Sequence, residues 1–357
     1  MISDWQLLSL EDCLDALIDY RGKTPKKTSS GIPLITAKII KDGRIKTPTE
    51  FIATNNYESW MRRGIPKCGD VVLTVEAPLG EVAQLGSEKI ALAQRVVTLR
   101  GKTGLLDSTY LLYWLQAEDA QDQLKARATG TTVLGIKQSE LRKLTISVPP
   151  MSVQLEAAKI LRSIDDRIAL LKEANKTLEA IAQALFKSWF VDFDPVREKM
   201  EGNVPEGIDA ATAALFPDSL ETSELGDIPK GWEVKTVGEV VETRGGSTPD
   251  TKNADYWEPG EFHWTSPKDL SGISSPVLLS TERKISAAGL KGISSGLLPS
   301  GTLLMSSRAP IGYLAINQVP VAINQGYIAI PPNGRLSPLY MLFWCHFNME
   351  TIKGHAN

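Results

Sequence analysis

The chain contains 357 residues, of which 42% are hydrophobic and 23% charged, and its net charge is −3. This length exceeds what a single hydrophobic core usually serves, so we expect more than one domain, and the ordinary composition excludes a disordered chain or a fibrous repeat. No apolar run approaches the roughly 18 residues of a membrane span, and the start Met1-Ile2-Ser3-Asp4 lacks the basic residues of a signal peptide, which predicts a cytoplasmic protein.

Charge is distributed unevenly along the chain. Residues 1–150 carry 20 basic and 17 acidic side chains, residues 151–227 carry 8 and 15, and residues 228–357 carry 11 and 10. Two near-neutral or mildly basic ends therefore flank an acidic middle, which permits DNA binding at both ends without proving it. The three cysteines and three histidines show no ligand spacing, so we predict packing cysteines, no disulfide framework and no metal site.

The first and last parts of the chain repeat one pattern. Residues 69–80 recur 232 positions later as residues 301–312, and both stretches contain an Ala-Pro-x-Gly motif. Four further segments return in the same order: 21–25 at 244–249, 35–38 more loosely at 264–268, 92–94 at 323–325, and 110–114 at 340–344. An internal repeat of this length indicates two copies of one module.

Each copy is predicted to be rich in β-structure with a covering helix. Short β-branched runs at 70–75, 96–99 and 327–330 are bounded by Gly and Pro, as strands are. Residues 111–124 and 339–352 change to helical spacing with aromatic residues on one face. The predicted fold class is therefore α+β, and these aromatic residues are interpreted as core.

A long helix is predicted between the copies, after Pro149 and Pro150, with Ser152 as a candidate N-cap. Its heptad seam consists of Ala157, Leu161, Ile164, Ile168, Leu171, Asn175, Leu178, Ala182, Leu185 and Trp189. A helix over residues 152–190 would be roughly 58 Å long, more than one small domain covers, so the seam needs a partner helix. Asn175 either fixes the register of that pairing or is a solvated irregularity.

The residues after this helix are interpreted as a linker. Pro195 disfavours helix at Asp194, so the long helix should end before residue 192. Several Pro and Gly residues follow, and the Ala-rich stretch at 208–216 is compatible with one short helix.

The sequence lacks the motifs that bind nucleotides. Neither GxxxxGK[ST] nor GxGxxG occurs, so no loop is predicted to cradle a nucleotide, and no plausible nucleophile elbow of an acyl-transfer enzyme is predicted. The acidic residues around Asp192 and Asp250 resemble the metal-binding carboxylates of nucleases only superficially, since each cluster lacks a further acidic partner. The sequence points to binding rather than catalysis.

Several segments, taken in order, resemble the specificity subunit of type I restriction-modification systems. They are residues 128–132 and 146–150 before the long helix, 188–195 after it, and 225–232 before the second copy. Together with the duplicated module, the resemblance covers essentially the whole chain. It implies two target recognition domains, at 1–150 and 229–357, a spacer helix at 151–191 and a linker at 192–228. Each domain would read one half of a bipartite DNA sequence.

The resemblance also implies the partners and the cofactors. In such systems a modification subunit transfers methyl from S-adenosylmethionine to adenine, and a restriction subunit uses ATP and magnesium as a motor and nuclease. This chain would be the non-catalytic subunit that binds double-stranded DNA and positions both, with no cofactor of its own.

Loop residues with basic or hydroxyl side chains are the candidate DNA contacts, because such groups hold phosphates and reach base edges. They are Arg21, Lys23, Thr24, Lys38, Thr129, Thr131, Thr132 and Lys137 in the first copy, and Arg244, Ser247, Thr248, Lys268 and Arg308 in the second. Each is alternatively an ordinary solvated loop residue. Gly22, Gly130, Gly245 and Gly246 are expected to permit tight turns or close backbone approach.

The second copy is predicted to be truncated. Aligning residues 125–129 with 353–357 places the end of the sequence one residue before the counterpart of Gly130, without a second heptad helix. The seam would then be an exposed association site, and we expect it to pair in trans with another copy or with a separately encoded specificity chain. A shortened gene product with one competent domain is the alternative.

Two other functions compete with DNA recognition. In a protein-interaction scaffold, or in an inactive remnant, the heptad helix would be the functional element and DNA would not be recognised by sequence. A self-contained methyltransferase or endonuclease is disfavoured because its motifs are missing. An affinity for DNA that falls steeply with salt would separate DNA binding from the scaffold.

Overall fold

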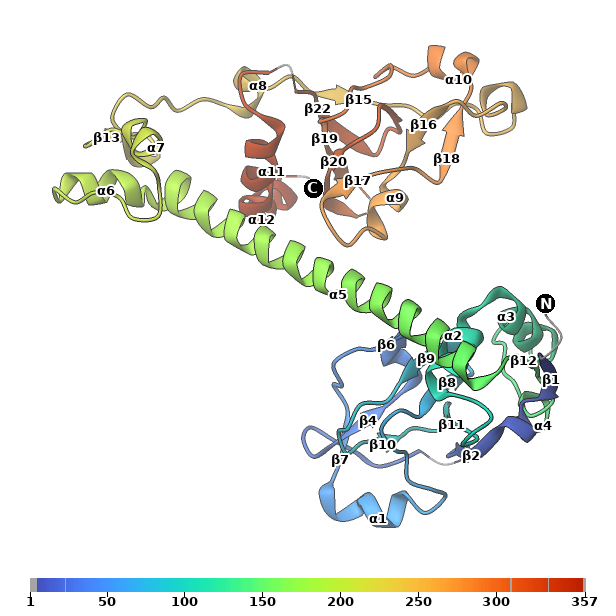
Figure 1. Cartoon of the computed structure of the whole chain (residues 1–357). Coiled ribbons are helices and arrows are strands. Elements are labelled where there is room, and N and C mark those ends of the chain that lie inside the picture. Colours follow the sequence, from blue (N-terminus) through green and yellow to red (C-terminus); the bar gives the residue numbers. More distant parts are fainter. Residues whose placement is uncertain (1–4, 23, 309, 333, 356–357) are drawn as a thin grey trace. The chain divides into compact units, whose positions relative to one another are not determined.

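The structure of the protein is a computed structural model that describes residues 5–22, 24–308, 310–332 and 334–355 (Figure 1). The chain divides into two compact units, and the division falls after Leu170, inside one long helix. Both units combine strands and helices, which confirms the predicted α+β class. No helix among the described residues is long and apolar enough to cross a membrane.

The first unit contains two four-stranded sheets and two strand pairs. The sheet with the order β2-β11-β8-β9 is antiparallel and consists of β2 (Leu14–Asp19), β8 (Val71–Val75), β9 (Leu79–Gln84) and β11 (Val96–Gly101). The sheet with the order β10-β4-β7-β3 consists of β3 (Lys27–Thr28), β4 (Ile32–Ile35), β7 (Phe51–Ile52) and β10 (Ala91–Leu92). The pairs are β1 (Gln6–Ser9) with β12 (Thr145–Val148), and β5 (Ile40–Lys41) with β6 (Arg44–Ile45).

Two consecutive helices, α2 (Ser108–Gln116) and α3 (Glu118–Ala126), cover the first of these sheets. The prediction of one helix over 111–124 is therefore wrong in one respect, since the backbone of Ala117 is extended and interrupts it. The Gln121 side chain stabilises the break by donating to the carbonyl of Leu115 at 2.6 Å, a contact that helical periodicity does not reveal. Shorter helices are η1 (Glu11–Cys13), η2 (Ala37–Ile39), η3 (Thr54–Asn56), α1 (Tyr57–Trp60) and α4 (Gln138–Leu141).

The second unit contains a five-stranded and a three-stranded sheet, with the orders β15-β22-β19-β20-β17 and β18-β16-β21. The strands are β15 (Arg244–Gly245), β16 (Phe262–Thr265), β17 (Val277–Leu278), β18 (Arg283–Ile285), β19 (Leu303–Ser307), β20 (Ile311–Asn317), β21 (Val321–Ile323) and β22 (Tyr327–Ile330). The helices are α8 (Val237–Val240), η5 (Ala254–Tyr256), α9 (Pro267–Ser271), α10 (Ala287–Lys291), α11 (Pro338–Phe347) and α12 (Met349–Gly354). The helix predicted over 339–352 is thus also divided, at Asn348.

The repeat extends to the register of the strands. Val71 pairs with Gln84 between β8 and β9, and Leu303 pairs with Ile316 between β19 and β20, at the same offset of 232. Both hairpins carry an irregularity before the Ala-Pro-x-Gly motif. Parallel pairing of β4 with β10 likewise returns as β16 with β21. The two units are therefore built on one plan, and the register makes Lys268 the counterpart of Lys38.

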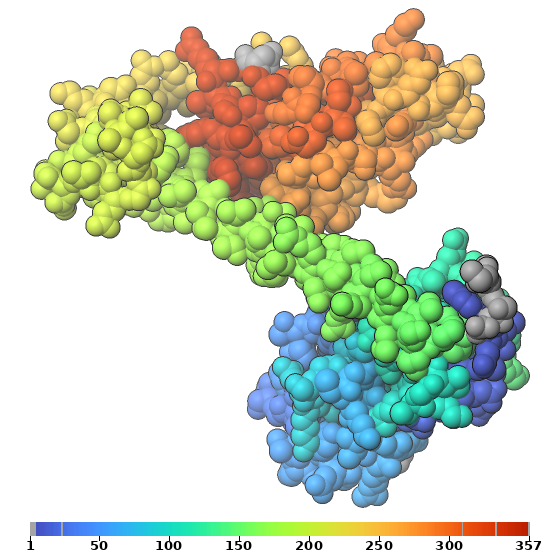
Figure 2. Space-filling view, viewed as in Figure 1, coloured from blue at the N-terminus to red at the C-terminus, as the bar shows by residue number. Residues whose placement is uncertain are grey.

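The predicted central helix is α5 (Met151–Lys187), continued by a π-helical turn, η4 (Ser188–Asp192). Ser152 is not its N-cap, because the helix already includes Met151 and the Pro150 carbonyl accepts the N–H of Gln154 at 3.1 Å. Figure 2 shows green atoms of α5 at the surface. Six apolar seam residues have exposed fractions between 41% and 62%. They are Leu161, Ile164, Ile168, Leu171, Leu178 and Leu185.

Residues 192–228, predicted to be a linker, form structure of their own. They contain α6 (Asp194–Met200), which has Pro195 in its first turn, α7 (Ala210–Ala214) within the predicted short helix, and the hairpin of β13 (Leu220–Ser223) and β14 (Gly226–Pro229). Aromatic side chains connect this segment to η4, since Trp189 packs edge-on against Phe216 with ring centroids 5.7 Å apart. Trp189 of the predicted seam therefore packs within its own unit.

Candidate nucleic-acid interface

In the first unit, loops that are distant in sequence meet beside the Ala-Pro-x-Gly hairpin. Thr24 Oγ1 donates to Gln94 Oε1 at 3.1 Å, and Arg95 forms an ion pair with Glu76 at 3.6 Å. Glu76 also forms a β-bridge with Gly135 of the loop that precedes Lys137. A cavity of 150 Å³ lies among these loops, and its lining includes Thr24, Lys27, Lys38, Gln94 and Arg95. This edge of the unit thus gathers amide, hydroxyl and cationic groups.

The candidate contacts of the first unit differ in how free their side chains are. Lys38 and Lys137 are exposed and have no side-chain partner among the described residues, and Thr131 and Thr132 are exposed as well. Thr129 closes its own loop through backbone hydrogen bonds to Gly135. Lys23 lies outside the described residues.

Arg21, in contrast, holds the loops together. Its guanidinium forms an ion pair with Asp19 at 2.6 Å and donates to the carbonyl of Ile136 at 2.6 Å. The Arg63 guanidinium in turn donates to the Arg21 carbonyl at 2.8 Å. A side chain committed to two partners positions the loops around it.

The loop over residues 129–135 presents two exposed apolar side chains that the sequence analysis did not select. Val133 and Leu134 are 49% and 44% exposed. Gly130 makes the tight turn possible, because its φ is +114° and a Cβ there would lie 2.1 Å from the Val133 carbonyl oxygen. The role expected for this glycine is therefore confirmed. Gly22 also has a positive φ, whereas a Cβ at Gly245 would meet nothing within 4 Å.

Substituting Gly130→Ala is expected to distort this loop without unfolding the unit, because the strain falls on exposed backbone. We expect affinity for duplex DNA to fall about tenfold, the effect of losing one charge-assisted contact, while the melting temperature changes by only a few degrees. Fluorescence anisotropy and a thermal melt of the same sample measure the two quantities. Gly104→Ala, a positive-φ glycine with open space around its Cβ position, is the matched control.

The second unit repeats this arrangement of loops. Thr248 Oγ1 donates to Gln325 Oε1 at 2.6 Å, and Arg308 donates to the Gln325 carbonyl at 2.8 Å. Ser247 takes part through its N–H, which donates to the Ile323 carbonyl at 3.0 Å. A Cβ at Gly246 would lie 1.9 Å from the same Ile323 oxygen, which confirms the close backbone approach expected there.

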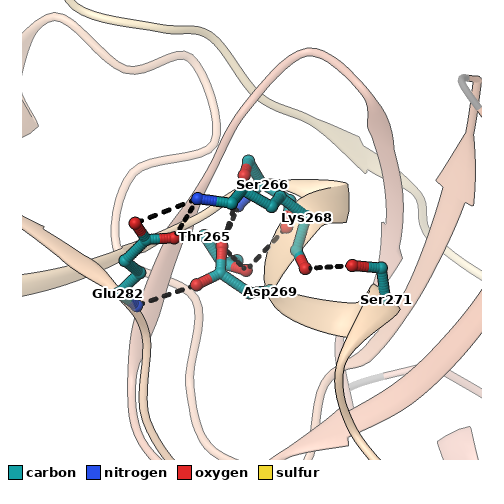
Figure 3. A network of polar contacts seen from close by, with 6 residues as sticks. All are labelled: Thr265, Ser266, Lys268, Asp269, Ser271 and Glu282. Carbon is teal, nitrogen blue, oxygen red and sulfur yellow. Dashed lines mark hydrogen bonds and ion pairs between the residues drawn. The ribbon is translucent and has the colours of Figure 1, made fainter. Parts of the chain in front are cut away.

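Two candidate cations of the second unit are already paired with carboxylates. Lys268 Nζ contacts the Glu282 carboxylate at 2.7 and 3.0 Å, and Asp269 accepts the N–H groups of Glu282 and Ser266 (Figure 3). The hydrogen bond to Glu282 raises the pKa of Lys268. Arg244 forms an ion pair with Glu242 at 2.9 Å. Arg308 is exposed, and its guanidinium meets a backbone carbonyl rather than a carboxylate.

The structure also shows how the first unit fixes the start of α5. Gln154 is completely buried, where it accepts the N–H of Asp107 at 2.9 Å and donates to the carbonyls of Leu105 and Pro149. Tyr113 donates to Asp165 at 2.9 Å. The aromatic residues of the repeat, predicted to be core, therefore also seat the helix. In the second unit Tyr340 and Phe343 contact α5 through aromatic packing against Phe186.

The hydrogen bond between Tyr113 and Asp165 is expected to weaken at alkaline pH. Burial, together with the hydrogen bond to Asp165, raises the pKa of Tyr113 to about 12, from 10.0 in an unfolded chain. Because the pKa is higher in the folded state, protonated Tyr113 contributes its full share to the free energy of unfolding below pH 10. That contribution is lost as the pH rises towards 12. We expect Tyr113→Phe to cost about 1 kcal/mol at neutral pH and to remove one tyrosine from the tyrosinate absorbance change around pH 12. An unchanged titration would contradict the assignment.

Among the described residues, no group of three or more His, Cys, Asp or Glu side chains is arranged to hold a metal ion. Cys13 and Cys345 are buried, as predicted for packing residues, but Cys68 is exposed, so that prediction is wrong for one of the three. The groups that the candidate interface offers for binding are its cations, hydroxyls and amides.

Residues 2–180 and 229–355 match the family model of the type I restriction modification DNA specificity domain. The chain belongs to this family. Its two matched segments coincide with the two copies of the repeat and include most of α5. The family predicted from the order of the sequence motifs is thus confirmed.

Similar proteins are specificity subunits of type I restriction enzymes. The chain is 43% identical to the MjaIX specificity subunit of Methanocaldococcus jannaschii over 136 residues, which is 38% of this chain and 31% of that protein. It is 27% identical to the HindI specificity subunit of Haemophilus influenzae over 256 residues, 59% of this chain and 54% of that protein. The matches thus span about a third and about half of these relatives.

The fold also resembles a solved structure. The crystal structure of a type I restriction-modification S subunit from M. genitalium aligns with a TM-score of 0.55 at 18% identity, covering 99% of this chain and 79% of that one. This likeness supports the arrangement of two β-rich modules and a long helix.

Proposed function

We propose that this chain is the DNA-specificity subunit of a type I restriction-modification complex. One observation carries the proposal: a chain of the DNA specificity domain family builds the same set of polar and cationic loops twice, at one strand register. Each unit would read one half of a bipartite sequence in double-stranded DNA. Phosphate contacts would position the units, and side chains reaching base edges would specify the sequence.

The chain is proposed to act without catalysis of its own. A modification subunit would supply S-adenosylmethionine and methylate adenine, and a restriction subunit would supply ATP-driven and magnesium-dependent cleavage. The absence of nucleotide-binding motifs from the sequence supports this division of labour. Its contribution would be binding energy that places the partner enzymes on the chosen DNA.

The exposed seam of α5 is proposed to pair with a second heptad helix. Its apolar residues are about half exposed over a stretch that includes Asn175, an arrangement typical of coiled-coil association. The partner would be another copy of this chain or a second specificity chain. Light scattering of the purified chain at micromolar concentration would show a dimer for self-pairing, and a monomer would exclude it.

Co-purification with the neighbouring modification subunit, followed by sequencing of the methylated adenines on random DNA, tests the proposal. A bipartite motif is expected if both units read DNA, and a symmetric motif if two first units pair across a dimer. A complex that methylates nothing, together with an affinity for DNA that does not depend on salt, would contradict the proposed function and favour a protein scaffold.

A further inference from the structure

A threonine–glutamine hydrogen bond occurs at the same place in both units. Thr24 donates to Gln94 at 3.1 Å in the first unit, and Thr248 donates to Gln325 at 2.6 Å in the second. In both cases the threonine hydroxyl donates its hydrogen bond to the amide oxygen of the glutamine. The amide nitrogen, which carries two N–H donors, is left for another acceptor. Neither Nε2 atom has a hydrogen-bond partner among the described residues.

The backbone around each glutamine is held in the same way. The N–H of Ala93 donates to the Ile35 carbonyl at 2.9 Å, and the N–H of Asn324 donates to the Thr265 carbonyl at 3.0 Å. Each glutamine therefore follows a strand, β10 or β21, in a turn tied to the neighbouring parallel strand. A side chain fixed at its backbone and at its amide oxygen loses little further freedom when it binds a ligand.

The residues around the two pairs differ in charge. The first unit has the free Lys38 and the Glu76–Arg95 ion pair. At the corresponding places the second unit has Lys268, paired with Glu282, then Arg308 in place of Glu76, and a glycine in place of Arg95. The duplication has thus kept the threonine–glutamine pair while its charged neighbours changed. Two units that read different half-sequences share only the sugar-phosphate backbone as a common ligand.

We propose that each threonine–glutamine pair is a phosphate-binding element, in which the amide nitrogen of Gln94 or Gln325 donates to a non-bridging oxygen of a DNA phosphate. Thr24 and Thr248 are positioning residues that fix the orientation of the amide. Base selection falls to the neighbours whose residue type differs between the units, which are Glu76 and Arg95 in the first unit and Arg308 in the second. The inference rests on the proposed function, because it assigns a ligand within the same interface.

The substitutions Gln94→Glu and Gln325→Glu test this element. Glutamate keeps an oxygen that accepts the threonine hydroxyl, but it replaces the two N–H donors with a negative charge. Each variant is expected to bind a fluorescein-labelled random-sequence duplex about tenfold more weakly in an anisotropy titration of the full chain. The double variant should lose about 100-fold, because distant sites usually contribute additively. The sequences selected from a random duplex library should not change.

Gln318→Glu is the matched control, because it makes the same charge change in the same unit as Gln325. Gln318 is exposed and directly follows β20, at the end of that strand away from the β19–β20 turn. Thr24→Val is a second test that adds no charge and leaves the amide free to rotate; a loss of a few-fold is expected. Variants that bind as tightly as the unaltered chain, or that change the selected sequence while retaining random-duplex binding, would overturn the phosphate assignment alone. An unaltered chain that binds no duplex at low salt would overturn the proposed function with it.

Discussion

Replacing Arg100 with methionine is expected to lower the free energy of unfolding of the first unit by about 3 kcal/mol, the lower end of the cost of breaking a buried ion pair, because the Asp70 carboxylate is buried while the Arg100 side chain is 23% exposed. Arg100 donates to both oxygens of the Asp70 carboxylate at 2.8 and 2.7 Å, and Asp70 is only 2% exposed. The same hydrogen bonds raise the pKa of Arg100. Methionine keeps an apolar stem of similar length, but it leaves the buried carboxylate without its cation.

Arg142→Met is the control for this prediction. Arg142 lies in the same unit and contacts Glu11 at 2.9 Å, but the two side chains are 33% and 59% exposed. Exposed pairs contribute about 0–1 kcal/mol, so this variant should unfold almost as the unaltered chain does. Urea denaturation with hydrogen exchange of peptides from β8 and β11 measures the first unit separately from the second. Equal losses from the two variants would contradict the role given to burial.

The second unit indicates how the loss can be reversed. The counterpart of Asp70 there is Thr302, which is buried and has no cation partner among the described residues. Its hydroxyl donates to the Pro299 carbonyl at 2.8 Å, and its backbone N–H donates to the Asn317 side chain at 2.6 Å. One fold thus tolerates either a charged or a neutral solution at this position. The double variant Asp70→Thr with Arg100→Met is therefore expected to recover most of the stability lost by Arg100→Met alone.

The features of the fold that were predicted correctly are those that depend on short-range patterns in the sequence. The strands at 70–75 and 327–330, the heptad helix and the internal repeat all follow from residue spacing over short windows. The break at Ala117 depends on Gln121, and the structure of the segment after α5 depends on aromatic contacts such as Trp189 with Phe216. Such contacts are set by tertiary packing, which periodicity does not encode.

The candidate interface shows the same division. The turns around Thr24 and Thr248 were visible because the motif repeats, but the pairing state of each charge was not. Arg21 meets a carbonyl 115 positions away, and Lys268 meets a carboxylate 14 positions away. Gln94 and Gln325 lie within the repeated segments, but an amide is neither a cation nor a hydroxyl, the two kinds of group predicted to contact DNA. Only their contacts with threonine separate them from ordinary loop residues.

Because Lys38 and Lys137 have no carboxylate partner among the described residues while Lys268 and Arg244 have one, we expect charge reversal to lower DNA affinity more in the first unit than in the second. Reversing the two free lysines together, with Lys38→Glu and Lys137→Glu, is expected to weaken binding to a random-sequence duplex about 100-fold at low salt. The slope of log affinity against log salt should fall by about 2, because two phosphate contacts that release counterions are lost. Anisotropy titrations over a range of salt concentrations give both quantities.

The charge-matched comparison is Lys268→Glu with Arg244→Glu. These cations are already paired with Glu282 and Glu242, so less of their charge is available to a phosphate. We expect a loss of only a few-fold and a salt slope that changes by less than 1. If both double variants lost affinity equally, binding would respond to the total charge of the chain rather than to the position of its free cations. A larger loss from the Lys38 and Lys137 variant would place the phosphate contacts of the first unit at these two lysines.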